Sequence, residues 1–301
     1  MIRIGVDFGG TKIEVAALDA GGGFAARVRA PNPGSYEPAI ELVRELVGRA
    51  EREASATRAS VGVGMPGSRS PKTGLIRNAN STWLNGRPFK EDLEAALGRP
   101  VRLENDANCF ALSEAHGGAG DGAAVVFGAI LGTGCGGGVV VRGTTIDGAN
   151  HIGGEWGHTP LPWPGVQERG AHECWCGRED CLETWISGSA FSADYAGVTG
   201  EALPGEAIVA RARAGEGAAR GALDRYIDRL GRGLAVICDI LDPDAIVLGG
   251  GMSNTDELYE AVVPVIRAYL FSDVFVTPVR RARFGDSSGV RGAAWLWPLD
   301  P

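Results

Sequence analysis

Four residues in the second half of the sequence could hold one metal ion. His158, Cys174, Cys176 and Cys181 offer an imidazole and three thiols over a short stretch. One nitrogen and three sulfur ligands suit tetrahedral Zn²⁺, and three crowded cysteines cannot all pair with one another as disulfides. His172 is a second candidate for the nitrogen ligand. The pattern therefore predicts a closed zinc site with a structural role.

Two carboxylates flank this metal-binding pattern. Glu155 and Glu183 lie within three residues of a predicted ligand. A bound metal would fix both carboxylates in space, and carboxylates held in this way suit the hydroxyl groups of a sugar. Two solvated surface glutamates are the alternative interpretation.

A glycine turn near the N-terminus could bind phosphate. The segment Asp7-Phe8-Gly9-Gly10-Thr11-Lys12 lies between two strand-like runs. Its glycines let backbone N–H groups approach a ligand, while Thr11 and Lys12 offer a hydroxyl and a positive charge. Asp7 could hold a hydrated Mg²⁺. The alternative is an ordinary hairpin turn.

Two further glycine turns follow apolar strands. The segment Gly132-Thr133-Gly134-Cys135-Gly136-Gly137 fits the dinucleotide fingerprint G-x-G-x-x-G, with Glu155 where a ribose carboxylate would stand. That fingerprint must open a helix, whereas Val139–Val141 continues as a strand, so a phosphate-binding hairpin is favoured. The run Gly249-Gly250-Gly251 precedes a helix and could receive a base or ribose, or could simply form a tight turn.

A carboxylate stands where a strand gives way to a helix. In Glu104-Asn105-Asp106, Asn or Asp is the residue expected at a helix N-cap. The helix dipole favours the ionised form of such a carboxylate, and an ionised Asp106 could accept a proton from a substrate hydroxyl. Capping and general-base catalysis are both consistent with this motif.

Alternating strands and helices position these motifs and indicate an α/β fold. The predicted strands are Ile2–Val6, Ile13–Leu18, Ser60–Val63, Val101–Leu103, Ala123–Leu131, Val139–Val141 and Ala245–Leu248. The predicted helices are Tyr36–Ser55, Asp106–His116, Leu234–Leu241 and Asn254–Leu270, and Gly289–Trp297 is an amphipathic stretch. A strand, a glycine turn with threonine and a second strand recur about 125 residues apart, which suggests a duplicated unit.

Length and composition bound the class of protein. A chain of 301 residues with 44% hydrophobic residues predicts two domains. We expect a small domain at 1–117, completed by 289–301, and a larger one at 118–288 that contains the zinc loop 158–181.

The net charge of −8 disfavours nucleic-acid binding. No secretory signal opens the sequence, so a cytoplasmic location is expected. The uncharged stretch 122–141 holds seven glycines, which favours two strands over a membrane span.

Taken together, the motifs resemble the ROK family of bacterial sugar kinases and sugar-responsive repressors. The resemblance rests on Asp7–Lys12, Glu104–Asp106, Glu155–His158, Cys174–Glu183 and Gly249–Met252, in this order, and covers essentially the whole chain. It implies an actin-like ATPase fold, a duplicated ribonuclease H-like α/β arrangement, with two domains and an active-site cleft between them. It also implies a homodimer that uses ATP and Mg²⁺ to phosphorylate a small-molecule hexose.

The resemblance also assigns roles to individual residues. It makes Asp106 the general base and gives sugar-binding roles to Asn80, Asn105, Asp106, Glu155, His158 and Glu183. The phosphate loops would comprise Asp7, Gly9, Gly10, Thr11, Lys12, Gly132, Thr133 and Gly134, and the adenosine loop Gly249, Gly250 and Gly251. The family usually has glycine before the last cysteine of its zinc motif, where this chain has Asp180. That departure puts the local turn geometry in doubt more than the metal.

Four stretches look more narrowly like the bacterial fructokinase or manno(fructo)kinase branch: Asn78–Gly86, Gly154–Trp163, Trp185–Ser189 and Gly285–Pro298. They lead us to expect D-fructose as acceptor and fructose 6-phosphate as product. N-acetylhexosamine kinases of the family tend to carry proline and glycine where Ser81 and Thr82 stand here. N-acetylhexosamines, glucose and mannose are the alternative acceptors.

Two other classes of protein explain less of the sequence. Family repressors carry an N-terminal helix-turn-helix, whereas here the strand-like pattern begins at residue 2 and the net charge is negative. A zinc-containing nicotinamide dehydrogenase would leave Asp7–Lys12 and Asn105-Asp106 without a purpose.

Overall fold

The computed structural model describes residues 2–298 and divides into two compact units. Within the described part, unit 1 comprises the residues up to Gly122, Gly138–Gly154 and the residues from Phe284 onward, and unit 2 comprises Ala123–Gly137 and Glu155–Arg283. The sequence led us to expect boundaries after residues 117 and 288, with no return of the chain to the small domain between them. The contacts place 118–122 and 138–154 in unit 1 as well, because Gly138 packs closely on the backbone of residues 107 and 108.

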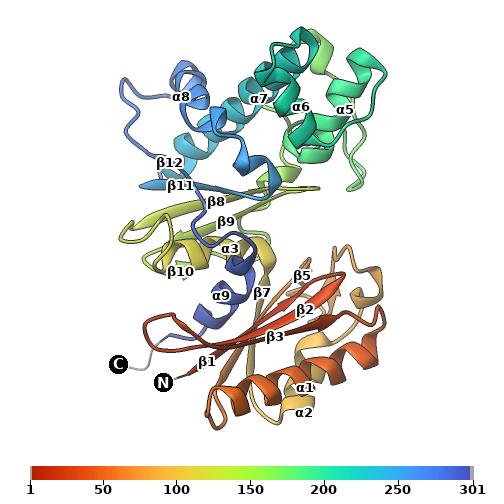
Figure 1. Cartoon of the computed structure of the whole chain (residues 1–301), viewed down its shortest axis with the longest axis vertical. Coiled ribbons are helices and arrows are strands. Elements are labelled where there is room, and N and C mark those ends of the chain that lie inside the picture. The colour runs from red at the N-terminus through yellow and green to blue at the C-terminus, as the bar shows by residue number, and fades with distance from the viewer. Residues whose placement is uncertain (1, 299–301) are drawn as a thin grey trace. The chain divides into compact units, whose positions relative to one another are not determined.

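The sheet of unit 1 has five strands (Figure 1). They are β1 (Arg3–Phe8), β2 (Lys12–Leu18), β3 (Phe24–Pro31), β4 (Ser60–Met65) and β7 (Val101–Asn105), in the order β3-β2-β1-β4-β7. The first three strands pair antiparallel, and β1, β4 and β7 run parallel. Beside this sheet, β5 (Ser68–Arg69) and β6 (Ile76–Arg77) form a short ribbon.

Helices cover both faces of this first sheet (Figure 1). The helices of unit 1 are α1 (Tyr36–Glu53), α2 (Phe89–Leu97), α3 (Asp106–Ala115) and α9 (Ser288–Trp295), with a short 3-10 turn at Thr82–Leu84. Helix α9 approaches the sheet so closely that two strand glycines are required. A Cβ on Gly5 or Gly62 would lie 1.9 Å from a carbonyl oxygen of that helix. Only glycine fits such a contact.

The second sheet repeats this strand order. Its strands are β8 (Val125–Leu131), β9 (Cys135–Val141), β10 (Thr144–Thr145), β11 (Ala245–Gly249) and β12 (Val279–Arg281), in the order β10-β9-β8-β11-β12. Strands β8 and β9 are neighbours joined by a short turn, β9 pairs antiparallel with β10, and β8, β11 and β12 run parallel. Each sheet thus opens on three strands linked in succession and continues with parallel strands, as the duplicated glycine turns indicated.

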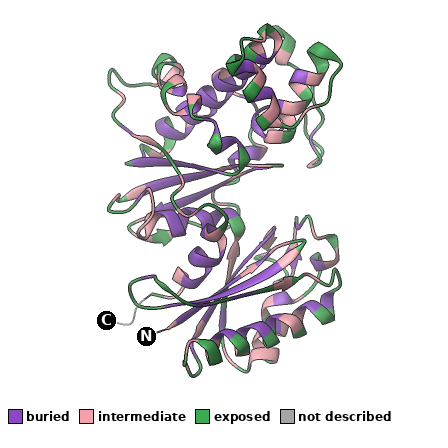
Figure 2. Cartoon of the chain, viewed as in Figure 1, coloured by how far each residue is buried: buried purple, intermediate pink, exposed green. Residues whose placement is uncertain are grey.

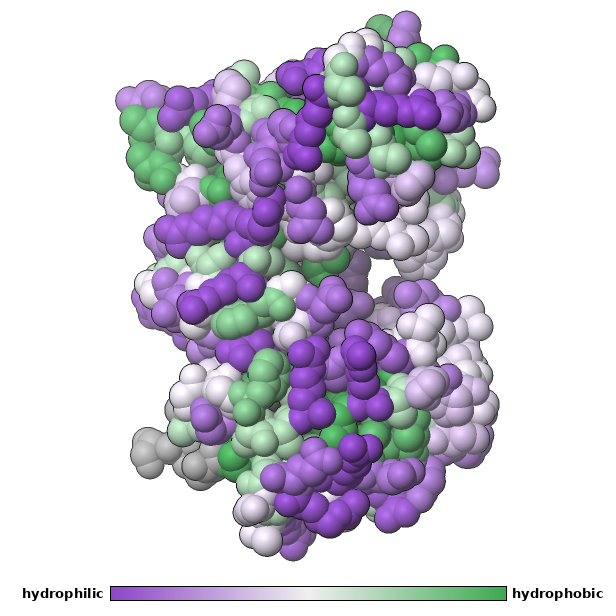
Figure 3. All heavy atoms as spheres, in the orientation of Figure 1, coloured by the Kyte–Doolittle hydropathy of each residue, from purple (hydrophilic) through white to green (hydrophobic). Residues whose placement is uncertain are grey.

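The helices of unit 2 are α4 (Glu183–Ile186), α5 (Gly188–Thr199), α6 (Gly205–Arg213), α7 (Gly217–Leu241) and α8 (Glu257–Tyr269). Figure 2 shows buried residues concentrated in the strands and on the inner faces of the helices. Strand β11 is buried along its whole length. The face drawn in Figure 3 mixes hydrophilic with hydrophobic side chains. Among the described residues, none of the helices is long and apolar enough to cross a membrane.

Candidate active site

The N-terminal glycine turn is the hairpin between β1 and β2, and Asp7 lies next to its tip. Asp7 pairs across the strands with Glu14, a buried residue that forms an ion pair with Arg27. The pKa of Asp7 is raised to about 6, first by burial and then by the nearby carboxylates of Asp106 and Glu14, while Lys12 opposes the shift. A bound cation would relieve this repulsion, so the donor set fits the hydrated Mg²⁺ expected from the sequence.

The tip of this hairpin presents backbone groups to solvent. Asn32 holds the loop in place: its side chain donates 2.8 Å to the carbonyl of Gly9, and its backbone N–H donates 2.9 Å to the carbonyl of Thr11. Gly10 and Thr11 are exposed. Because the carbonyls of Gly9 and Thr11 already accept hydrogen bonds from Asn32, the loop can direct its N–H groups to an anion. Asn32 carried no signal in the sequence, since it comes after a strand that the apolar pattern did not reveal.

Asp106 is the first residue of α3, and Asn105 is its N-cap. The side chain of Asn105 accepts a hydrogen bond of 2.8 Å from the N–H of Ala107 and donates to the carbonyl of Gly67 at 3.1 Å. Asp106 is exposed, and its Oδ1 also accepts from the N–H of Ala107. The capping interpretation is confirmed, and the residue that caps the helix is Asn105, not Asp106. Asp106 lies within the first turn, where the helix dipole stabilises its ionised form.

Glu104, the residue before Asn105, stabilises the start of α3 through its carboxylate. One carboxylate oxygen accepts the N–H of Asn105 at 2.8 Å and the side-chain amide of Asn108 at 3.1 Å. Burial raises the pKa of Glu104, and these two hydrogen bonds oppose that effect. Glu104 therefore orders the strand-to-helix junction.

The stretch around Asn80 forms a loop closed by Asn85. The Asn85 side chain accepts from the N–H of Ala79 and donates to its carbonyl. This closure leaves Asn80 exposed, and a Cβ on Gly10 would meet Ser81 Oγ at 3.4 Å. The structure therefore brings the predicted sugar loop beside the predicted phosphate hairpin of the same unit.

In unit 2, two glycine turns meet at the ends of neighbouring parallel strands. Gly132–Gly134 links β8 to β9, and Gly250 comes directly after β11, which pairs with β8. A Cβ on Gly250 would lie 2.6 Å from the carbonyl group of Leu131, and Gly250 has a φ of 79°. Strand β9 begins immediately after the first turn, so the choice of a hairpin over a dinucleotide fold is confirmed.

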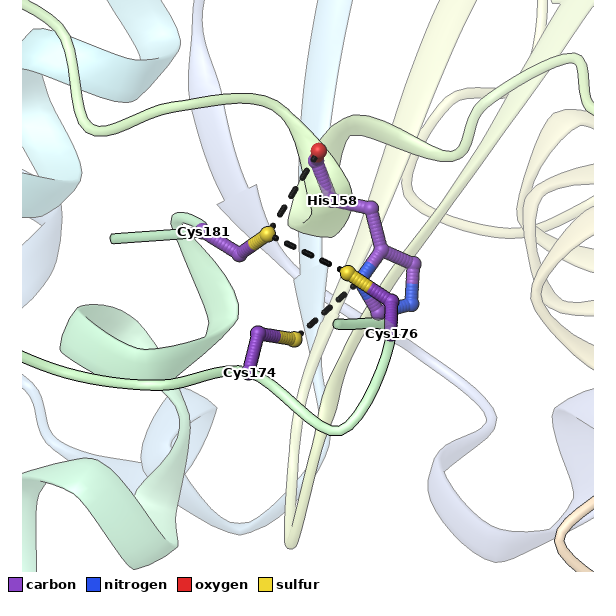
Figure 4. A group of neighbouring side chains, drawn as sticks. All are labelled: His158, Cys174, Cys176 and Cys181. Carbon is purple, nitrogen blue, oxygen red and sulfur yellow. Dashed lines mark hydrogen bonds between the residues drawn. The ribbon is translucent and has the colours of Figure 1, made fainter. Parts of the chain in front are cut away.

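The four predicted metal ligands converge (Figure 4). Their ligand atoms all lie within 4.8 Å of one another. The sulfurs of Cys176 and Cys181 are 3.5 Å apart, and Cys174 Sγ lies 3.6 Å from Nδ1 of His158. Zn–S bonds of about 2.3 Å would hold two sulfur ligands about 3.8 Å apart. The spacing and the chemistry of the four side chains fit Zn²⁺.

The rival nitrogen ligand lies elsewhere. His172 is exposed and packs against the ring of Trp185, with 4.3 Å between ring centroids. The position before the last cysteine also keeps the turn that glycine would make. Asp180 has a φ of 56°, and its carboxylate accepts backbone N–H groups of residues 170, 171 and 172. Aspartate tolerates the left-handed region, so the departure preserves the loop.

The segment before the first ligand is anchored from β9. Trp156 is buried and donates its indole N–H to the carbonyl of Gly136 at 2.9 Å. A Cβ on Gly157 would lie 2.1 Å from the carbonyl oxygen of Cys135. These contacts fix the short 3-10 turn Trp156–His158, with Glu155 exposed just before it.

Glu183 connects the metal-binding loop to the start of β9 through two hydrogen bonds. One carboxylate oxygen accepts the backbone N–H of Cys135, and the other accepts the indole N–H of Trp175, each at 2.8 Å. Trp175 stands between two metal ligands and was not among the residues predicted from the sequence. Its carboxylate partner is eight residues away along the chain, a spacing that no local rule connects.

The two sheets of equal strand order, each opened by a glycine hairpin, define the actin-like ATPase fold that sugar kinases use. The ROK family profile matches residues 3–299, and the chain belongs to the ROK family.

Individual relatives cover nearly the whole chain. The N-acetyl-D-glucosamine kinases of Pectobacterium atrosepticum and Pasteurella multocida are 39% and 40% identical, each over 98% of this chain and 99% of its own length. Among solved structures, the ROK hexokinase of Thermus thermophilus has a TM-score of 0.88 and 35% identity, covering 98% of this chain and 97% of that one. A ROK glucokinase from Streptomyces griseus, in complex with glucose and AMPPNP, has a TM-score of 0.75 and 28% identity, covering 98% of both chains.

These relatives do not support the expected fructokinase branch. That expectation came from four short stretches, whereas the identity to N-acetyl-D-glucosamine kinases extends over the whole chain. A short motif gives information only about its own loop. Side chains from several loops can contribute to the choice of acceptor sugar.

Proposed function

We propose that the chain transfers the γ-phosphoryl group of ATP to a hydroxyl of a free hexose, with Asp106 as general base. One observation carries the proposal: unit 1 places an exposed carboxylate at a helix N-terminus near a half-buried carboxylate on a glycine hairpin. The helix dipole suits Asp106 to proton transfer, and the crowding around Asp7 suits that residue to a cation.

The reaction needs positioning more than covalent chemistry. The hydroxyl oxygen bonds to the γ-phosphorus as the bond to the β–γ bridging oxygen breaks, and ADP leaves. Asp106 receives the hydroxyl proton, late in a loose transition state. Asp7 would hold Mg²⁺, which supplies charge neutralisation at the phosphate oxygens. The hairpin around Gly9, Gly10 and Thr11 and the turn Gly132–Gly134 would donate backbone N–H groups to phosphate.

We propose N-acetyl-D-glucosamine as the leading acceptor. The support is the 39–40% identity to kinases of that name over 98% of the chain. The polar side chains of Asn80, Asn105, Glu155, His158 and Glu183 would bind the hydroxyls. A site that matches buried polar groups to particular hydroxyls can reject an analogue by a large factor.

D-Fructose is the second candidate, and the loop that carries Asn80 favours it. Ser81 and Thr82 stand where N-acetylhexosamine kinases tend to carry proline and glycine. Ser81 lies against Gly10 of the phosphate hairpin, so this loop is placed to affect the acceptor.

We also propose that His158, Cys174, Cys176 and Cys181 hold one structural Zn²⁺. The ligand distances support this, and four protein ligands leave no open coordination position for catalysis. The metal would fix the loop that carries Trp175 and leads into Glu183.

Steady-state kinetics with ATP and Mg²⁺ across N-acetylglucosamine, fructose, glucose and mannose tests the acceptor. We expect the highest kcat/KM for N-acetylglucosamine, about tenfold or more above fructose. A higher value for fructose would select the second candidate and leave the kinase proposal intact. No ATP-dependent turnover of any of these sugars, or of their amino-sugar analogues, would overturn the kinase proposal itself.

A further inference from the structure

Trp175 combines two properties that its place in a metal-binding loop does not require. It lies between Cys174 and Cys176, yet its side chain reaches Glu183, to which its indole N–H donates at 2.8 Å. It is also 67% exposed. Its one hydrogen-bond donor is thus directed at a carboxylate that is itself a predicted sugar contact.

The hydrogen bond orients a carboxylate that has a second anchor. The other oxygen of Glu183 accepts the backbone N–H of Cys135, the first residue of β9. A Cβ on Gly134 would lie 2.6 Å from that same oxygen, so the carboxylate also sits tightly against the turn. Two donors on different oxygens fix both the position and the plane of the carboxylate, and each oxygen keeps a lone pair for a further donor.

The indole also borders a second predicted sugar contact. The rings of Trp175 and His158 meet edge to face, with centroids 4.9 Å apart and an interplanar angle of 82°. Trp156 and Trp185 of the same unit are 4% exposed, whereas Trp175 keeps most of its ring surface open to solvent. An exposed indole face beside a carboxylate and an imidazole suits a ligand that is apolar on one side and bears hydroxyls at its edge. A pyranose ring has this character.

We propose that Trp175 is a positioning residue of the acceptor site: it holds Glu183 through its indole N–H and offers an aromatic face to the sugar. This inference rests on the proposed function, because it takes Glu183 and His158 as sugar contacts. It gives the metal loop a direct part in acceptor affinity, through a side chain that is not a ligand of the metal.

Two substitutions separate the two contributions. Trp175→Phe keeps an aromatic face and removes the N–H donor, and Trp175→Ala removes both. Trp163→Phe is the matched control, because Trp163 is also an exposed tryptophan of unit 2 and packs only against Tyr269 among the aromatic rings described. For each protein we would measure sugar Kd by calorimetry, KM for sugar and ATP, kcat, and zinc content.

We expect Trp175→Phe to raise the sugar Kd and KM by roughly 5- to 10-fold, which matches the ordinary net contribution of one hydrogen bond. Trp175→Ala should raise them by roughly a further 2- to 5-fold. The KM for ATP, the zinc content and the Trp163→Phe control should stay at wild-type values. Unchanged sugar Kd in both Trp175 variants would overturn the inference, and so would equal losses for sugar and ATP or a loss of zinc, which indicate a structural role. If wild-type protein binds no hexose, the proposed function fails first, so the two failures are distinguishable.

Discussion

The two sheets share one strand order, but their first hairpins differ in charge. The hairpin from β1 to β2 carries Asp7 and Lys12, and the hairpin from β8 to β9 lies in a stretch without any charged residue from 122 to 141. Both turns present glycine backbone where two neighbouring strands are joined. The repeated fold therefore supplies glycine turns twice, while the carboxylate that we propose to hold the cation, Asp7, belongs to the first repeat.

The repeats also differ in the connection after their third strand. In the first sheet, the single helix α1 leads from β3 to β4. In the second, β10 and β11 are separated by the metal-binding loop and four helices, α4 to α7. The connection between β10 and β11 can accommodate inserted elements because it lies outside the paired strands. We infer that the first repeat provides the general base, and that the insertion of the second repeat adds Glu155, His158 and Glu183 to the acceptor contacts of the first repeat.

The largest expected effect removes the base from the first repeat. Asp106→Asn keeps the shape and the helix-start position but cannot accept the proton, so kcat should fall about 10²- to 10⁴-fold. Folding should be unchanged, because Asn105 provides the N-cap. Steady-state kinetics and thermal unfolding check this, and a kcat within threefold of wild type would remove Asp106 from the mechanism.

The next effect tests the insertion of the second repeat. Cys181→Ser should release zinc and raise the KM for sugar about 10- to 100-fold, while the KM for ATP changes little. Metal analysis and kinetics measure both. Cys238→Ala is the control, since Cys238 is a buried cysteine of α7 that does not belong to the ligand group. Zinc-free wild-type protein with full activity would contradict this assignment.

The third effect concerns stability rather than activity and uses the charge difference between the hairpins. The pKa of Asp7 is raised, chiefly by burial, to about 6 in the folded protein, against about 3.9 in the unfolded chain. The folded state therefore binds the extra proton between these values, and ionising Asp7 costs stability as the pH rises from about 4 to 6. Above that range the cost is constant, at about 2–3 kcal/mol.

Asp7→Asn should therefore raise the free energy of unfolding by about 2–3 kcal/mol near pH 7.5, measured without nucleotide or Mg²⁺. The gain should shrink towards zero below about pH 4. Asp224→Asn, on an exposed part of α7, should change the free energy by no more than about 0.5 kcal/mol at either pH. A gain for Asp7→Asn that does not depend on pH would mean that the stability change has a cause other than the ionisation of this carboxylate.

Much of the fold and part of the site could be predicted from local sequence. The glycine turns, the strands beside them and the Asn105-Asp106 helix start follow from backbone rules that act within a few residues. Helix α5 escaped prediction because its small residues give it no clear apolar face, and only Phe191 and Tyr195 of it are buried. Strand β3 alternates only Ala26 and Val28 towards the core.

The parts of the site that could not be predicted depend on contacts distant in sequence. Spacing left His172 as a rival to His158 for the nitrogen ligand, and the fold separates them by packing His172 against Trp185. Asn32 and Trp175 each form a hydrogen bond with a residue outside their own stretch of sequence, Gly9 and Glu183. Local sequence patterns do not reveal these partners. The acceptor sugar is the same kind of problem, because several loops determine it together.

The most direct test of sugar activation by Asp106 measures products. Wild-type protein is incubated with MgATP and N-acetyl-D-glucosamine, and ADP and phosphorylated sugar are quantified together, with Asp106→Asn as the blank. We predict one phosphorylated sugar for each ADP formed, and almost none of either in the blank over the same time. ADP formed without sugar phosphate, or equal product from the Asp106→Asn protein, would contradict the claim that the first repeat activates a sugar hydroxyl through this carboxylate.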